Sequence, residues 1–222
     1  MSKWEYGGAY LRHPIAPGKV VLFEDGSKLK VHNIFDQLPP FMREADLVFV
    51  DPPLNQGNLN SFYTKAGRTD YHDSFIPFYK RLFECIKEIK PKTCYVEIGK
   101  EYLAEFILEM KQLFKQVTFY NSSYYHRREN MCYVIRGSRK RKKLPLDYMD
   151  EEGIISWVCK NEEYNCIGDL CMGQGLVGIH AHKNGKKFVG TELNHRRLSV
   201  LVEQLVKDGC SYELIEYKGE SR

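Results

Sequence analysis

The chain has 222 residues, of which 43% are hydrophobic, 13% aromatic and 28% charged, and its formal net charge at pH 7 is +4. This composition excludes a largely disordered chain, and the length suits one α/β domain with a sizeable core. The mild positive charge selects no class of partner by itself.

The first quarter of the chain is predicted to contain strands and a long loop. Residues 19–33 have the pattern of a β-hairpin, which we assign to an N-terminal extension over residues 1–30. The apolar run at 47–50 shows no alternation, which is typical of a parallel strand covered on both faces. Residues 54–72 are rich in Asn, Gly, Ser and Tyr without a period, and this predicts a long loop.

Strands and helices alternate over the rest of the chain. Asp73 is the expected N-cap of a helix that ends before Pro91. Further strands are expected over 94–98, 117–120, 131–135, 165–169 and 187–192, and further helices over 101–114, 150–160, 176–184 and 194–207. This order predicts an α/β fold with a mostly parallel central sheet and an antiparallel hairpin near 117–135. We expect a single domain over residues 1–222.

Cysteine usage and hydropathy indicate the compartment. The seven cysteines form no CxxC pair, and Cys94, Cys132 and Cys166 lie inside strand-like runs, which favours buried thiols over disulfides or zinc. Neither HExxH nor a Cys/His zinc spacing is present, so we expect no metal. No apolar run approaches the ~20 residues of a membrane span, and the N-terminus lacks an apolar signal core. We therefore expect a cytoplasmic protein without a membrane partner.

A Gly-rich turn, Asp169-Leu170-Cys171-Met172-Gly173-Gln174-Gly175, follows the strand at 165–169. Glycines at the carboxyl end of a strand let the backbone approach a nucleotide-like ligand, because no Cβ intervenes. The next strand ends in Glu192, whose carboxylate could accept hydrogen bonds from both hydroxyls of a ribose. The turn is not GxGxxG, so an adenosyl ligand without phosphates fits better than NAD or ATP. The alternatives are a tight structural turn and a Glu192 that only caps the next helix.

The sharper signal is Asp51-Pro52-Pro53, at the end of the strand at 47–50. An exocyclic amino nitrogen of adenine or cytosine is a poor nucleophile, because its lone pair is delocalised into the ring. Hydrogen bonds from the amino group to the Asp51 carboxylate and to a backbone carbonyl would localise that lone pair. Two prolines fix φ and remove amide hydrogens, which leaves rigid carbonyl acceptors. An ordinary Asp-Pro turn is the alternative interpretation.

With these two motifs in this order, the chain resembles the DNA amino-methyltransferases that methylate adenine N6 or cytosine N4. It is similar to their permuted class (beta-type order), in which the catalytic tetrapeptide, here Asp51-Pro52-Pro53-Leu54, precedes the cofactor loop. The resemblance covers residues 30–208 and implies a Rossmann-like S-adenosylmethionine-dependent methyltransferase fold with its cofactor-binding half at 150–208. It implies that S-adenosylmethionine is bound by Asn33, Asp169, Cys171, Gly173, Gly175, Glu192 and Asn194.

The chain departs from the family pattern at three places. The fourth catalytic position is usually an aromatic residue that stacks on the flipped base, and here it is Leu54. The cofactor turn lacks the usual Pro-Phe after its Asp and the usual Ser between its glycines. The Lys-Pro expected before the helix at 150–160 is replaced by Asp147-Tyr148-Met149-Asp150. Leu54 bears on the target and on turnover more than on cofactor binding.

Two segments are candidates for contacts with nucleic acid. The segment 54–72 is predicted to wrap the target base with Phe62, Tyr63, Lys65 and Arg68. A basic linker at 136–149 opens with six positive charges in eight residues, which suits a salt-sensitive contact with a phosphate backbone. Its expected contact residues are Arg139, Lys140 and Arg141, together with Arg127 and Arg128 nearby. A solvated charge run is the alternative for this tract.

These observations predict an S-adenosylmethionine-dependent methyltransferase that acts on the exocyclic amino group of a base in DNA. Adenine is favoured, because the cytosine enzymes of the family more often begin the tetrapeptide with Ser. The alternatives are methylation of adenine in RNA and a catalytically inert partner subunit that binds ligand without turnover, which Leu54 favours. The short linker leaves no room for a recognition domain, so specificity is low or comes from residues 54–72, a homodimer partner or a separate protein.

Overall fold

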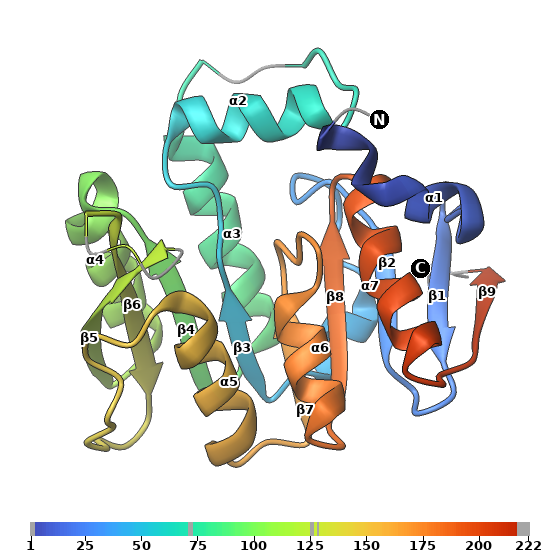
Figure 1. The fold of residues 1–222 in the computed structure, drawn as a ribbon. Helices are drawn as coiled ribbons and strands as arrows, with labels where there is room; N and C mark the ends of the chain where they lie inside the picture. The colour runs from blue at the N-terminus through green and yellow to red at the C-terminus, as the bar shows by residue number, and fades with distance from the viewer. Residues whose placement is uncertain (1–2, 71–72, 125–126, 128, 217–222) are drawn as a thin grey trace.

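The computed structural model describes residues 3–70, 73–124, 127 and 129–216. Over these residues the chain forms one central sheet with helices on both faces (Figure 1). Its strands are β1 (Lys19–Phe23), β2 (Lys28–Val31), β3 (Leu47–Val50), β4 (Thr93–Ile98), β5 (Gln116–Ser123), β6 (Met131–Ser138), β7 (Cys166–Asp169), β8 (Lys187–Glu192) and β9 (Tyr212–Glu216). The α/β prediction is therefore confirmed.

The sheet is mixed. Its strand order is β5-β6-β4-β3-β7-β8-β2-β1-β9. The middle run, β4-β3-β7-β8-β2, is parallel, whereas β5 and β6 on one side and β1 and β9 on the other pair antiparallel to their neighbours. The expected antiparallel hairpin near 117–135 is confirmed as β5–β6. The sheet is parallel in its centre and antiparallel toward its edges, because the chain reverses direction through hairpins near both edges.

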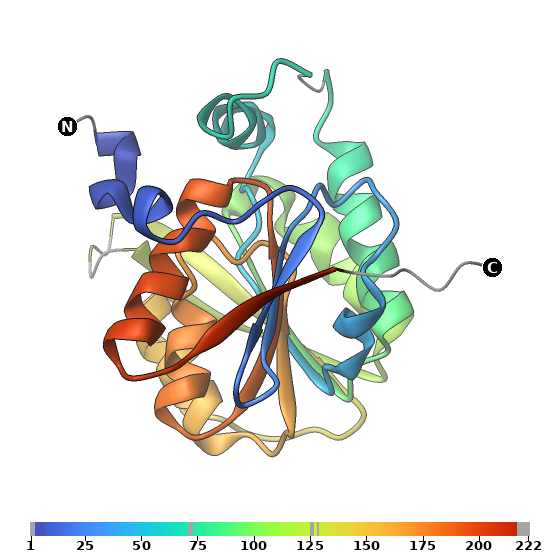
Figure 2. The same cartoon turned by 90° about the vertical axis from the view of Figure 1, so that its right-hand side faces the viewer.

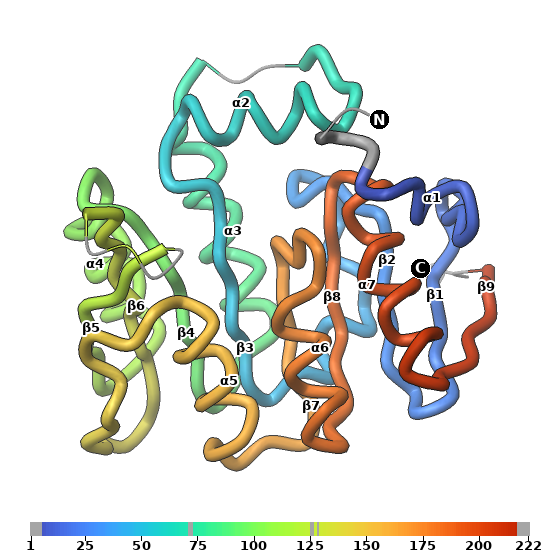
Figure 3. The backbone as a smooth tube through the Cα atoms, in the orientation of Figure 1, coloured from blue at the N-terminus to red at the C-terminus, as the bar shows by residue number. Residues whose placement is uncertain are grey.

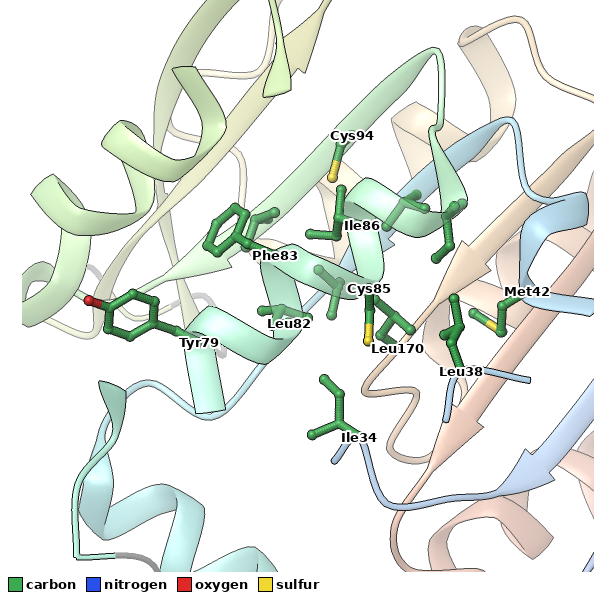
Figure 4. Packing of buried hydrophobic residues seen from close by; sticks show 14 of the residues in the cluster. Ile34, Leu38, Met42, Tyr79, Leu82, Phe83, Cys85, Ile86, Cys94 and Leu170 are labelled. Carbon is green, nitrogen blue, oxygen red and sulfur yellow. The ribbon is translucent and has the colours of Figure 1, made fainter. Parts of the chain in front are cut away.

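Two hydrophobic layers hold the helices against the sheet. The helical segments are η1 (Lys3–Gly8), α1 (Ala9–Arg12), η2 (Pro40–Glu44), α2 (Gln56–Lys65), α3 (Ile76–Ile89), η3 (Lys100–Tyr102), α4 (Leu103–Leu113), α5 (Glu151–Asn161), α6 (Leu176–Lys183) and α7 (His195–Lys207). Helices α3 and α4 pack on one face of the sheet, and α5, α6 and α7 pack on the other. Figure 4 shows Leu82 and Cys85 of α3 on the side of Ile34 and Leu38, from the segment before η2, and Ile86 on the side of Cys94. No described helix combines the length and apolar character of a membrane span.

The N-terminal hairpin is part of the sheet and not an extension. Strand β2 pairs in parallel with β8, so that Val31 lies beside Glu192. Strand β9 then pairs with β1 at the outer edge, which faces the viewer in Figure 2. No strand was predicted there; Tyr212–Glu216 is only five residues long and has no buried position. Residues 9–13 also contact α7, where the Ser199 hydroxyl donates to the carbonyl of His13 at 2.9 Å.

The predicted loop at 54–72 is wrong for residues 56–65, which form helix α2. The side chain of Asn55 caps the helix by accepting a hydrogen bond from the amide of Asn58 at 3.0 Å. Leu59 and Tyr63, four residues apart on one face, are buried. The many polar residues on the other face hide this period in the sequence. Helix α2 crosses over the carboxyl ends of the parallel strands (Figures 1 and 3).

The remaining predicted elements are all found, most of them within about two residues of their expected bounds, but β5 and β6 each extend three residues beyond the ends expected at 120 and 135. One cap is wrong: α3 begins at Ile76 after Phe75, and Asp73 lies before the capping position. Cys94, Cys132 and Cys166 are buried free thiols, as expected from their place in strands.

Candidate active site

Four acidic side chains lie at one edge of the sheet because the parallel strands end there together. Asp51 follows β3, Glu97 is near the end of β4, and Asp169 and Glu192 end β7 and β8. Strands β3 and β7 are direct neighbours, with Val48 paired to Gly168, although 120 residues separate them in the sequence. The Asp-Pro-Pro motif and the Gly-rich turn therefore lie side by side. This edge is where ligands bind in open α/β sheets.

The Gly-rich turn depends on two left-handed glycines. Gly173 has φ 58° and Gly175 has φ 86°, a region that residues with a Cβ rarely adopt. A Cβ on Gly173 would lie 2.6 Å from Nη2 of Arg197, and one on Gly175 would lie 2.5 Å from Cδ2 of Leu201. The turn thus has space only for a bare backbone toward α7.

Asp169 supports the turn from within. Its Oδ1 accepts a hydrogen bond from the amide of Cys171 at 2.9 Å, and its side chain is buried. Burial raises the pKa of the Asp169 carboxyl well above its usual range, and the Cys171 amide opposes part of that shift. Asp169 therefore closes an Asx turn at the strand end and holds the Cys171 backbone in place.

Glu192 is bonded to the backbone on both oxygens. Its Oε2 accepts from the amide of Gly173 at 2.6 Å, and its Oε1 accepts from the amide of Asn194 at 2.9 Å. The Arg197 guanidinium lies 4.0 Å from Oε2. The carboxylate thus joins the Gly-rich turn to the start of α7. The N-cap residue of α7 is Asn194 and not Glu192, and each oxygen of Glu192 retains a further lone pair for a ligand.

Helix α2 is fastened to the cofactor side of the site. The side chain of Asn194 donates to the carbonyl of Lys65 at 2.9 Å, and its Oδ1 caps α7 by accepting from the amide of Arg196 at 3.0 Å. The Tyr63 hydroxyl donates to Oδ1 of Asn33 at 3.0 Å. Asn33 and Asn194, both predicted as cofactor residues, therefore act as anchors for α2 in this structure.

The residues predicted to wrap a base differ in their accessibility. Tyr63 is 2% exposed and lies in the hydrophobic core, so its ring is not free to stack on an extruded base. Phe62 is half-buried, with its ring centroid 4.9 Å from Cζ of Arg197 and 5.1 Å from Nζ of Lys65. Arg68 donates to Asp70 at 2.8 Å. The prediction for Tyr63 is corrected because its helical pairing with Leu59 turns the ring inward.

Asp51 lies just beyond the end of β3 and is exposed to solvent. The surrounding protein nevertheless desolvates its carboxyl and raises its pKa to about 6, opposed by a hydrogen bond from Tyr124 and by the charge of Arg197. The Tyr124 hydroxyl donates to Oδ1 of Asp51 at 3.3 Å. Pro52 and Pro53 are buried. The raised pKa still leaves Asp51 largely ionised at pH 7 to 8, as a hydrogen-bond acceptor.

Leu54, three residues after Asp51, lines a surface cavity, called the hollow below. The hollow has a volume of about 520 Å³, within the range of about 300–1,000 Å³ typical of small-molecule sites. It is bordered by Leu54, Asn55, Gly99, Lys100, Glu101, Glu129, Met131 and Tyr133. A Cβ on Gly99 would lie 3.7 Å from Leu54, so the leucine packs directly against the β4–η3 turn. Tyr133 and Met131 supply the apolar wall that faces it.

Glu97 is a site residue that the sequence prediction missed. Its side chain is 0% exposed, and among the described residues neither carboxyl oxygen has a hydrogen-bond partner of normal geometry. Burial and the charge of Asp51 raise its pKa well above the usual range, partly offset by Tyr124 and Cys132. The signal that could have found it is a lone acid inside the apolar strand Cys94-Tyr95-Val96-Glu97-Ile98.

The basic tract divides into a buried part and an exposed part. Arg136 is 6% exposed, forms an ion pair with Glu162 at 3.2 Å and donates to the Tyr95 hydroxyl at 3.0 Å. It is therefore an internal residue of β6, and the predicted linker begins only after Ser138. Within the linker, Leu144 is buried and packs in the hydrophobic core.

The exposed part of the tract lies away from Asp51. Arg139, Lys140 and Arg141 are exposed and follow Ser138, which pairs with Thr93 at the start of β4, whereas Asp51 lies beyond the opposite end of the neighbouring strand. In Figure 1 this loop runs below the sheet and α2 lies above it. Arg127 is exposed near Tyr124, on the side of the site, and Arg128 lies outside the described residues.

Comparison with known proteins identifies the fold. No family model matches the sequence, and no curated protein matches it significantly. The structure of the M1.HpyAVI complex with S-adenosylmethionine is similar, with a TM-score of 0.56 and 12% identity over 80% of this chain and 98% of that chain. TTHA0409 of Thermus thermophilus, named as a DNA modification methylase, matches with a TM-score of 0.57 and 13% identity over 81% of this chain and 94% of its own. The chain has a methyltransferase fold.

At these identities the methyltransferase fold is what the likeness establishes. TTHA0409 has also been crystallised with S-adenosylmethionine. The chemistry of the present chain must be argued from its own residues.

Proposed function

We propose that this protein is an S-adenosylmethionine-dependent methyltransferase that modifies the exocyclic amino group of a base, with adenine N6 in DNA as the favoured target. The observation that carries the proposal is the pairing of β3 with β7. It brings an amine-accepting Asp-Pro-Pro segment next to a glycine turn suited to an adenosyl ligand. Either motif alone occurs in unrelated α/β proteins. Because the two motifs lie side by side at the carboxyl ends of β3 and β7, we infer that they belong to one active site.

The residues present fit S-adenosylmethionine. Gly173 and Gly175 carry no Cβ, so the backbone of the turn can come close to an adenosyl group. Glu192 has lone pairs for ribose hydroxyls, and Asn33 lies under α2 for the adenine. The M1.HpyAVI and TTHA0409 structures that share this fold hold the same compound. When bound, it supplies an electrophilic methyl group on a sulfonium.

Asp51 and the Pro52 carbonyl would accept hydrogen bonds from the two amino hydrogens of the target base. These bonds draw the nitrogen toward tetrahedral geometry and localise its lone pair for an in-line displacement, in which the N–C bond forms as the S–C bond breaks. The sulfur keeps the bonding electron pair as a neutral thioether, and the aminium product releases one proton to solvent to become a neutral secondary amine. Orientation of the two reactants supplies much of the acceleration.

Nucleic-acid contacts are proposed at two separate places. Phe62, Lys65 and Arg68 on and after α2, with Arg127, surround the side of the site where a target base would enter. Arg139, Lys140 and Arg141 are at the far edge of the sheet, and would contact a different stretch of phosphate backbone.

A catalytically inert binding subunit is the second candidate. The observation that favours it is Leu54, which packs against the Gly99 turn and presents no ring to a flipped base. Such a subunit would have the same fold and the same cofactor turn but would not methylate a substrate.

One assay separates these candidates. Purified protein and S-adenosylmethionine are incubated with unmethylated duplex DNA, single-stranded DNA and RNA, and the digested nucleosides are analysed by mass spectrometry. Methyladenine that disappears in Asp51→Ala, with calorimetric cofactor binding intact, supports the enzyme and identifies the polymer. Cofactor binding without any methylated nucleoside supports the inert subunit, and absence of both rejects the proposal.

A further inference from the structure

The buried carboxyl of Glu97 lies directly beside Asp51. Strands β3 and β4 are parallel, and Val50 pairs with Val96. The residues that follow these two, Asp51 and Glu97, are therefore neighbours across the strand pair. The rings of Phe49 and Tyr95, two residues earlier, stack at 5.7 Å on one face of the sheet. Because side chains alternate along a strand, Asp51 and Glu97 point to that same face.

Tyr124 is close to both carboxyls. Its hydroxyl donates to Oδ1 of Asp51 at 3.3 Å, and burial together with the charges of Asp51 and Glu97 raises the pKa of the Tyr124 phenol. A phenol has a single hydrogen, so it cannot donate to both acids at once. If the hydrogen serves Asp51, any hydrogen bond between Tyr124 and Glu97 must use a proton carried by Glu97.

The surroundings of Glu97 decide where that proton resides. Besides burial, the groups that shift the pKa of Glu97 are Asp51 after β3, Tyr124 after β5, Cys132 of β6 and Glu151 of α5, and none of these is a cation. Glu162, lower on the same face of the sheet, provides the contrast. Arg136 and Lys142 pair with it at 3.2 Å and its pKa is lowered. A fully buried acid without a cation is stable only in its neutral form.

We propose that Glu97 is a positioning residue of this site, which as a neutral carboxylic acid donates to the oxygen of Tyr124 and thereby directs the Tyr124 hydroxyl to Asp51. The inference rests on the proposed function, since it assigns Asp51 the amine-accepting role. Oδ1 of Asp51 is then held by Tyr124, and Oδ2 is left for the target amine. Ionisation of Glu97 would remove the donor and place a second negative charge beside Asp51.

This arrangement predicts a bell-shaped dependence of kcat on pH. Asp51 must be ionised, which produces the acid limb, and Glu97 must be protonated, which produces the alkaline limb. Since the two carboxyls interact, the apparent values belong to the pair. Glu97→Gln keeps the shape and a donor toward Tyr124 but cannot ionise.

The first test compares pH profiles of kcat for methyl transfer. We expect Glu97→Gln to keep kcat near neutral pH within about threefold and to lose the alkaline limb, and Tyr124→Phe to lower kcat about tenfold, the scale of one hydrogen bond. Glu151→Gln is the matched control, because it removes a carboxyl that faces the same cluster and is expected to retain the alkaline limb. An alkaline limb unchanged in Glu97→Gln overturns the inference.

The second test does not depend on turnover. Carbon-13 NMR of protein labelled at Asp and Glu carboxyls follows the titration of each acid, with the Glu97 resonance assigned by its loss in Glu97→Gln. We expect that resonance to be that of a carboxylic acid at pH 7, whereas a carboxylate at pH 7 overturns the inference. If no substrate is methylated, the proposed function fails on its own, and the NMR titration still decides the state of Glu97.

Discussion

The hydroxyl of Tyr63 donates a hydrogen bond of 3.0 Å to the side chain of Asn33, which lies in a segment 30 residues earlier. This bond ties α2, the helix above the candidate active site, to the loop that follows β2. A second bond, from Asn194 to the carbonyl of Lys65, ties the end of α2 to α7. The helix that would meet the target base is thus fastened to residues on the cofactor side, so occupancy of one side is expected to affect the other.

The Tyr63–Asn33 bond is predicted to stabilise the fold measurably. Because the bond is largely buried, Tyr63→Phe and Asn33→Ala should each lower the free energy of unfolding by about 1 kcal/mol, and the double variant should lose less than the sum of the two. Urea denaturation of the four proteins measures this coupling. Additive losses would mean that the two side chains act independently.

The glycine turn provides a matched pair of substitutions. Gly175→Ala and Gly209→Ala both place a Cβ on a left-handed residue, at φ 86° and 97°, which costs about 1–2 kcal/mol. At Gly175 the Cβ would meet Leu201, at 2.5 Å, whereas at Gly209 no atom of the described residues lies within 4 Å. We expect the first variant alone to lose affinity for S-adenosylmethionine in calorimetry. Equal affinity of both variants for S-adenosylmethionine would mean that the turn does not contribute to cofactor binding.

The buried and exposed parts of the basic tract should respond differently to substitution. Arg136→Ala leaves the Glu162 carboxylate with Lys142 and Tyr95 as its remaining partners, which predicts a loss of about 1–3 kcal/mol in the free energy of unfolding. Arg139→Ala, three residues along and exposed, should change it by less than about 0.5 kcal/mol. Thermal or chemical denaturation measures both, and equal effects would contradict the division.

The exposed tract should act only on long nucleic acid. Replacement of Arg139, Lys140 and Arg141 by Ser is expected to reduce the slope of log affinity against log salt by about 0.9 for each phosphate that these side chains neutralise. Methylation of a short oligonucleotide should be unaffected, because the tract and Asp51 lie at opposite ends of the strands. Fluorescence anisotropy on short and long duplexes makes the comparison, and an equal decrease in affinity for both would place the tract at the site.

The carboxyl cluster predicts that the free protein becomes less stable at alkaline pH. The pKa values of Asp51 and Glu151 are raised to about 6 and about 7, and that of Glu97 is raised as well, so the folded state binds these protons more tightly than the unfolded chain. Their contribution is complete below about pH 4 and is lost as pH rises through the folded values. His32, with its pKa lowered to about 4, opposes this trend only below about pH 6.5.

Urea denaturation at several pH values tests this predicted loss of stability. The free energy of unfolding, obtained by urea denaturation, should decrease between about pH 6.5 and 8.5, and Glu97→Gln should flatten the decrease. A free energy that stays constant over this interval would mean that Glu97 and Glu151 are already ionised in the folded protein at about pH 6.5.

The sequence by itself determined the local elements and the two motifs. The apolar run before Asp51, the glycines after Asp169 and the periodic helices over 76–89 and 195–207 can be recognised because strand burial, turn geometry and helix faces depend on neighbours within about one turn or strand. Composition and order likewise indicated an α/β fold.

Only the tertiary structure decided which elements meet. The pairing of β3 with β7, the antiparallel edges of the sheet and the burial of Arg136 depend on contacts between residues far apart in the chain, which no local period records. The same holds for Tyr63, whose ring turns inward toward Asn33, and for Glu97, whose neutral state arises because no cation faces it among the described residues. Burial and charge are properties of the assembled sheet, and they change a surface residue into a core residue, or an anion into an acid, without any change in the sequence.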